Sequence, residues 1–120
     1  MYENLLQCNK NIITVNCGKF REIIQYTENQ DKIIKYFIKI NKKLVKEYGS
    51  FSYIFSVKTS LLSDIQYLNF FIKFTLTMQD NFPDELDSII IEDTNDIVIY
   101  LFSYVSVFFT PDVSNKIHFV

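Results

Sequence analysis

The segment from Thr27 to Gly49 has the spacing of an amphipathic helix, and the rest of the fold must accommodate that helix. Its apolar residues recur every three or four positions and share one helical face, while its lysines fall on the opposite face. Thr27 begins a capping-box pattern, and Gly49 stands where a glycine commonly caps a helix C-terminus. The sequence therefore predicts a long helix with one face on the core and the other in solvent.

Short runs rich in β-branched and aromatic residues alternate with helical segments. They predict strands at residues 11–17, 51–57, 88–92 and 116–120. A second capping box at Ser63 opens another helix, which must stop near Phe82 because the residue before Pro83 is pushed out of the helical region. This alternation predicts an α/β fold with a mostly parallel sheet, helices packed on it and right-handed crossovers. A chain of 120 residues suits one domain, spanning 1–120.

The apolar stretch 97–109, IVIYLFSYVSVFF, permits two interpretations. Its isoleucine, valine and aromatic content favours a strand. Polar residues before it and Thr110-Pro111 after it equally suit a helix that is buried nearly all round. It is shorter than the roughly 20 residues that a membrane-spanning helix needs. The residues themselves leave strand and helix open.

The charges are divided between two parts of the chain. The net charge of −2 argues against a nucleic-acid partner, which would require a strongly basic surface. Lysines gather in residues 32–46, and acidic residues gather in 80–96. The two groups are either the solvated faces of two elements or a means of orienting the protein at an anionic surface.

Neither the cysteines nor the single histidine forms a recognisable chemical site. Cys8 and Cys17 have no zinc-site spacing, and the N-terminus lacks the basic and apolar regions of a signal peptide, so we expect reduced thiols and a cytoplasmic protein. His118 lies in an apolar strand, where a satisfied core residue is more common than a base. Residues 92–96 resemble a calcium loop only loosely, because the glycine and closing glutamate are missing. We therefore expect no enzyme activity, no catalytic residue, no metal and no cofactor.

The segment 79–120 carries an ordered pattern: QDNFPDEL, the short strand SIIIE, the apolar stretch, and FFTPDVSNKIHFV. This order resembles the Sec14-like (CRAL-TRIO) lipid-binding domain, and the offset from Pro83 to Lys116 fits that family's spacing without a gap. Upstream, NIITVNCGKF, the lysine-rich helix and SYIFSVKTS follow in the family's order. Ser56 and Thr59 stand near the positions where the family often has Asp-x-x-Gly.

The resemblance implies that 97–109 is the family's mobile gate helix, although an ordinary core helix would have the same composition. A lipid pocket between this helix and the sheet would include Ile97, Tyr100, Leu101, Tyr104, Val105 and Phe108, with His118 as a neighbour. Asp84 and Lys116 match the residues that hold the head group in phosphoinositide-binding members. A solubilising charge at the end of a sheet is the alternative role of Lys116.

The resemblance also implies a function. The expected activity is binding of a phospholipid of phosphoinositide type or a similar hydrophobic small molecule, with its transfer left open and with transient contact at membrane surfaces. The chain departs from the family pattern in lacking its N-terminal helical region and its C-terminal end, so that unpaired sheet edges would favour a homodimer. The alternative function is that of a degenerate copy of the fold, acting as a protein-interaction module without bound lipid.

Overall fold

The structure is a computed structural model that describes residues 1–57 and 62–120, with the side chains of residues 62 and 63 left undescribed. The strands in this part of the chain are β1 (Leu6–Asn9), β2 (Ile12–Asn16), β3 (Phe51–Ser56), β4 (Leu86–Glu92) and β5 (Ile117–Phe119). The α-helices are α1 (Cys17–Ile24), α2 (Thr27–Tyr48), α3 (Leu68–Asn81), α4 (Asp96–Val105) and α5 (Pro111–Ser114). Two 3-10 helices complete it, η1 (Leu62–Tyr67) and η2 (Ser106–Phe108).

The strands form one sheet in the order β1-β2-β3-β4-β5. β1 pairs antiparallel with β2, and every later neighbour in the sheet is parallel. Tyr53 on the central strand lies opposite Ile13 on one side and Ile89 on the other. The predicted α/β class and mostly parallel sheet are therefore confirmed.

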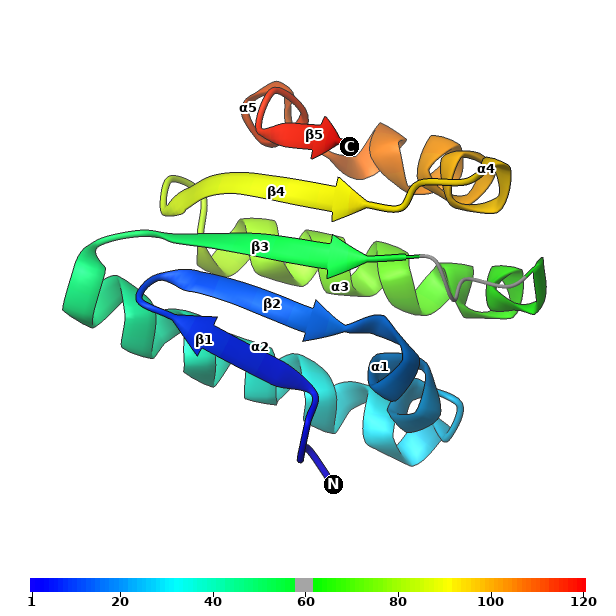
Figure 1. Cartoon of the computed structure of the whole chain (residues 1–120), viewed down its shortest axis with the longest axis horizontal. Coiled ribbons are helices and arrows are strands. Elements are labelled where there is room, and N and C mark those ends of the chain that lie inside the picture. The colour runs from blue at the N-terminus through cyan, green and yellow to red at the C-terminus, as the bar shows by residue number, and fades with distance from the viewer. Residues whose placement is uncertain (58–61) are drawn as a thin grey trace.

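Helices α2 and α3 cover one face of the sheet, and the other face stays open (Figure 1). Alternation along the strands divides the side chains between the two faces. On β2 and β3, the buried side chains of Ile13, Val15, Phe51 and Tyr53 point to the helices. Thr14 and Ser52 alternate with them and face outward. One layer of helices and one sheet thus enclose a single core.

Aromatic rings dominate that core. Phe37 of α2 is fully buried, and its ring meets those of Phe20 on α1 and Phe74 on α3 edge-to-face, with centroids 5.6 and 5.2 Å apart. Such pairs contribute about 0.5–1.5 kcal/mol beyond area burial. Phe37 therefore joins three helices at one point.

The long helix α2 ends as the sequence predicts but begins differently. Gly49 caps its C-terminus in the left-handed region, with φ of 85°. At the other end, Tyr26 occupies the N-cap position and Thr27 is already helical, so the capping box does not form. Gln30, which would complete that box, instead donates to the carbonyl of Ile24 at 2.8 Å and joins α2 to the end of α1.

The apolar stretch 97–109 is helical as far as Phe108, as α4 followed by η2. The Asn95 side chain caps α4 by accepting from the Val98 amide at 3.0 Å, which offsets the local preference for a strand.

β1, α1 and α5 were not expected from the sequence. The cap of α1 is a recognisable signal, because the Asn16 side chain accepts from the Lys19 amide at 3.1 Å.

None of the helices in the described residues is both long enough and apolar enough to cross a membrane.

The two glycines give a matched test of the cap on α2. Gly49→Ala should lower the free energy of unfolding by about 1–2 kcal/mol, because alanine resists a positive φ. Gly18→Ala is the control, since a methyl group there lies 3.5 Å from Asn16 Oδ1, an ordinary contact, within a helix. Urea denaturation of both variants measures the difference, and equal effects would contradict the role of the left-handed cap.

Candidate ligand-binding cavity

A cavity of about 290 Å³ lies between the helical face of the sheet and the helices α3 and α4. Side chains of β3 and β4 line its sheet side, including Tyr53, Phe55 and Ile91. Phe74 and Met78 of α3 line another wall, together with residues of α4. Most of the lining is apolar or aromatic, as is usual for small-molecule sites.

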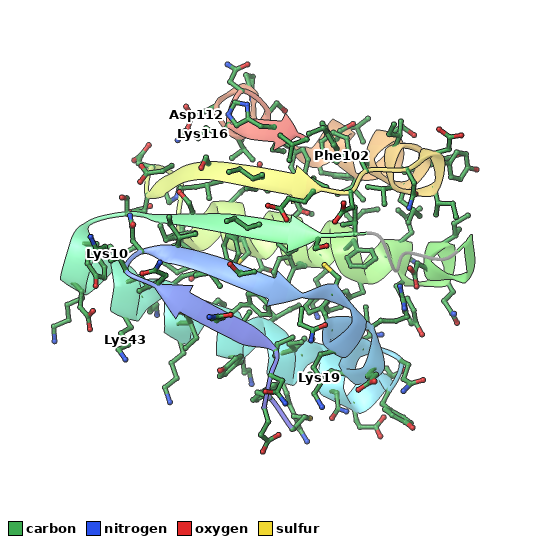
Figure 2. All side chains as sticks on the ribbon, in the orientation of Figure 1. Lys10, Lys19, Lys43, Phe102, Asp112 and Lys116 are labelled. Atoms are coloured by element: carbon green, nitrogen blue, oxygen red, sulfur yellow. The ribbon has the colours of Figure 1, made fainter. Side chains whose placement is uncertain are left out.

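Helix α4 contributes one stripe of side chains to the cavity. Val98, Leu101, Phe102 and Val105 all line it, and their spacing of three and four places them on one helical face. The Phe102 ring (Figure 2) also packs against the rings of Phe109 and Phe119, with centroids 5.4 and 5.0 Å away. These contacts tie α4 to the last strand.

The Gln79 side chain of α3 holds the segment that follows α4. Its amide nitrogen donates to the Phe108 carbonyl at 2.8 Å, and its amide oxygen accepts from the Thr110 backbone N–H at 2.8 Å. Gln79 also lines the cavity. One side chain therefore fixes the backbone that joins α4 to α5.

A buried polar group lies in the middle of the cavity wall. Asn41 of α2 has no exposed surface, and its side-chain oxygen accepts a hydrogen bond of 2.5 Å from the Tyr53 hydroxyl. The Asn41 amide nitrogen points to Met78 Sδ at 3.5 Å. Burial raises the pKa of Tyr53 far above its usual range, and the bond to Asn41 opposes this only in part. The Tyr53 hydroxyl therefore stays protonated and neutral.

At the carboxyl ends of β2 and β3 the cavity lining includes an ion pair. Arg21 of α1 binds Asp64 of η1 through two hydrogen bonds, Nε to Oδ1 at 2.8 Å and Nη2 to Oδ2 at 3.1 Å. Asp64 is only 7% exposed. The Cys17 thiol lies beside the pair, and burial raises its pKa to about 11. The charge of Arg21 opposes this rise, whereas the charge of Asp64 adds to it. The thiol is neutral at physiological pH.

The lipid-pocket residues that the resemblance implies divide into two groups. Leu101 and Val105 line the cavity, whereas Ile97, Tyr100, Tyr104 and Phe108 are not part of its lining. Tyr100 and Tyr104 are exposed on the outer side of α4, where their hydroxyls lie 3.1 Å apart. Helical spacing alone does not select the inward stripe, because Ile97, Tyr100, Tyr104 and Phe108 also recur at intervals of three and four.

The expected head-group residues lie away from the cavity. Lys116 Nζ forms an ion pair at 3.1 Å with Oδ2 of Asp112, four residues earlier in the chain (Figure 2). Asp84 is exposed in the turn before β4. Both precede strands, so they lie at the amino ends of β4 and β5, and neither lines the cavity.

His118 lies on the open face of the sheet. It pairs in register with Ile90, while its neighbours Ile117 and Phe119 point to the helical side. It is exposed and outside the cavity. In the described residues, no three His, Cys, Asp or Glu side chains come together in a way that could hold a metal ion.

The polar residues of the cavity were missed at the level of sequence. Asp64 and Arg21 are 43 positions apart, so their pairing has no local signature. Asn41 interrupts the apolar stripe of α2, and this interruption was the one available signal, since a buried amide needs a partner.

The thiol of Cys17 gives the structure a dependence on alkaline pH. Its pKa is about 11 in the folded chain against 9.0 for an unperturbed thiol, so the unfolded chain loses its proton first and stability falls as pH rises from 9 to 11. The loss should approach about 2–3 kcal/mol. Urea denaturation across this range should show a shallower decline for Cys17→Ala, and parallel profiles would contradict burial of the thiol.

No protein-family model matches the chain, and no curated protein matches its sequence.

Proposed function

We propose that this protein binds a hydrophobic or amphiphilic ligand of the lipid class in the cavity between the sheet and α4, and carries it without changing its bonds. The observation behind this proposal is the apolar cavity itself, about 290 Å³ in a chain of 120 residues. The cavity is partly open to solvent, so without a ligand its apolar lining is in contact with water. Contact between water and apolar surface is unfavourable by about 25 cal/mol per Å². A ligand would offset that cost.

The volume limits the ligand to a small one. Cavities of roughly 150 Å³ hold benzene, and drug-sized sites begin at about 300 Å³. The cavity has about 290 Å³, which suits a single chain or a compact ring system. Two acyl chains together would require α4 to move outward.

The lysine-rich face of α2 supports transient contact with anionic membranes. Its exposed lysines are Lys32, Lys35, Lys39, Lys42, Lys43 and Lys46. Lys43 points away from the body of the protein, and Lys10 of the neighbouring turn lies on the same side (Figure 2). Each lysine near an anionic surface contributes about 1 kcal/mol, and salt screens the attraction. This contact would bring the protein to the surface where a ligand is exchanged.

A phosphoinositide as the ligand rests on the resemblance alone. That resemblance assigns the head group to Asp84 and Lys116, which lie outside the cavity lining. Lys116 is also paired with Asp112. The proposed ligand is therefore defined by the lipid class and not by one head group.

The outer side of α4 and η2 favours a second candidate function, that of a protein-interaction module. Ile99 is 55% exposed and Val107 is 75% exposed, and Tyr100, Tyr104 and Phe108 are exposed beside them. Neighbouring exposed apolar side chains of this kind commonly mark interaction sites. In this candidate the cavity would remain without ligand.

Native mass spectrometry of protein purified from a eukaryotic host separates the two candidates. Lipid binding predicts a retained small molecule that extraction with organic solvent removes. Thermal denaturation before and after extraction should show a loss of several degrees, because a ligand that binds only the folded state stabilises it. Fully folded protein that is ligand-free and takes up no lipid would contradict lipid binding.

Two adjacent residues of α4 test the position of the ligand. Val98 lines the cavity and is 9% exposed, so Val98→Phe should fill part of the cavity and weaken binding of a neutral apolar dye such as Nile red by about tenfold. Ile99→Phe is the control, because Ile99 points to solvent. Equal affinities for both variants, measured by fluorescence titration, would exclude the cavity as the binding site.

A further inference from the structure

The cavity has a polar end whose position differs from the one expected for a lipid head group. Among the described residues that line it, the charged ones are Arg21 and Asp64. Asp64 lies in η1, beyond the carboxyl end of β3, and Arg21 lies in α1, directly after β2 (Figure 1). Ligands of open α/β sheets commonly bind outside the carboxyl ends of the strands. The amino ends, where Lys116 and Asp84 lie, are the opposite edge.

The two charges at this end neutralise each other. The guanidinium of Arg21 faces the carboxylate of Asp64 in a two-bond arrangement, with distances of 2.8 and 3.1 Å. The side chains are 26% and 9% exposed, so the pair is largely screened from water. A bidentate pair of this kind has fixed geometry and no net charge. The adjacent thiol of Cys17 adds no charge at neutral pH, because burial raises its pKa.

At this end, a charged ligand group would be attracted by one member of the Arg21–Asp64 pair and repelled by the other. A carboxylate or phosphate that approaches Arg21 also approaches the Asp64 carboxylate, and an ammonium group meets the same conflict with Arg21. Neither interaction would offset the loss of hydration of an ion brought into an apolar cavity. A hydroxyl, amide or carbonyl group loses far less hydration and can hydrogen-bond to polar side chains.

The middle of the cavity also disfavours a charged ligand group. Asn41 and the Tyr53 hydroxyl, the polar groups of that wall, are both uncharged. Beyond them the lining is mainly apolar as far as Phe82 and Val113, at the amino ends of the strands. No part of the described lining carries a net charge.

We infer that the cavity selects an uncharged, single-chain or compact amphiphile, whose polar group lies at the Arg21–Asp64 end. This inference rests on the proposed lipid-class function and narrows its ligand. A long-chain alcohol or monoacylglycerol has the required chemistry, whereas a fatty acid or a phosphoinositide does not.

Three probes with the same chain and different head groups test the inference: n-decanol, decanoate and decylammonium. Displacement of bound Nile red at neutral pH gives their relative affinities for the full chain. Decanol should bind wild-type protein about tenfold more tightly than either ion, because only the ions lose strong hydration without gaining a counter-charge. Decanoate or decylammonium binding as tightly as decanol would overturn the inference while leaving lipid binding intact.

Asp64→Asn tests the polar end directly. The substitution removes the negative charge that faces Arg21 in this pair, so decanoate affinity should rise about tenfold while decanol affinity stays within about threefold of wild type. Asp31→Asn is the matched control, because it removes the same charge from an exposed ion pair with Lys73 outside the cavity lining. A folded Asp64→Asn protein with unchanged decanoate affinity would overturn the assignment of this end.

Two further results are decisive. If Asp64→Asn does not fold, the order of the three probes in wild-type protein decides the inference alone. If none of the three binds folded wild-type protein, the proposed lipid-class function itself fails, a result distinct from binding in the wrong order.

Discussion

The burial of one face of the central strand, β3, is the interaction on which the rest of the structure depends. Phe51 and Tyr53 point from it toward the helices, where the Tyr53 ring meets that of Phe37 on α2 and the Phe51 ring meets that of Phe82 at the end of α3. The Tyr53 hydroxyl also binds Asn41, so β3 and α2 are joined by packing and by a hydrogen bond. Because β3 pairs with β2 and β4, positioning it positions the sheet.

The one-sided arrangement of helices explains both the open face and the cavity. Parallel sheets are usually covered on both faces, yet here the outward side chains of β3 and β4 include Ser52 and Ser88, whose hydroxyls lie 3.2 Å apart. These hydroxyls let part of that face meet water, and Ile54 and Ile90 alternate with them on the same face. On the covered face, α2 fills its half of the sheet, while α3 and α4 leave an apolar volume beside β3 and β4. The proposed ligand would complete the core there.

Local pattern predicted much of the fold and little of the cavity. The apolar stripe of α2, its glycine cap and the β-branched strands are properties of neighbouring residues, and the structure confirms each. The helical state of 97–109 required the sheet, because packing on β5 and the cap at Asn95 outweighed the strand preference of its residues. The polar residues of the cavity depend on pairs far apart in the chain, such as Arg21 with Asp64, which no local pattern encodes.

The sequence by itself determined the α/β class, the mostly parallel sheet and the long lysine-faced helix, because periodicity and capping act over a few residues. Only the tertiary structure decided which residues of α4 face inward, since a helix that is apolar on nearly all sides carries no sequence signal for its rotation. It also placed His118 and Lys116 outside the cavity and brought Arg21 to Asp64. These outcomes depend on how the elements pack against one another, which is a property of the whole chain.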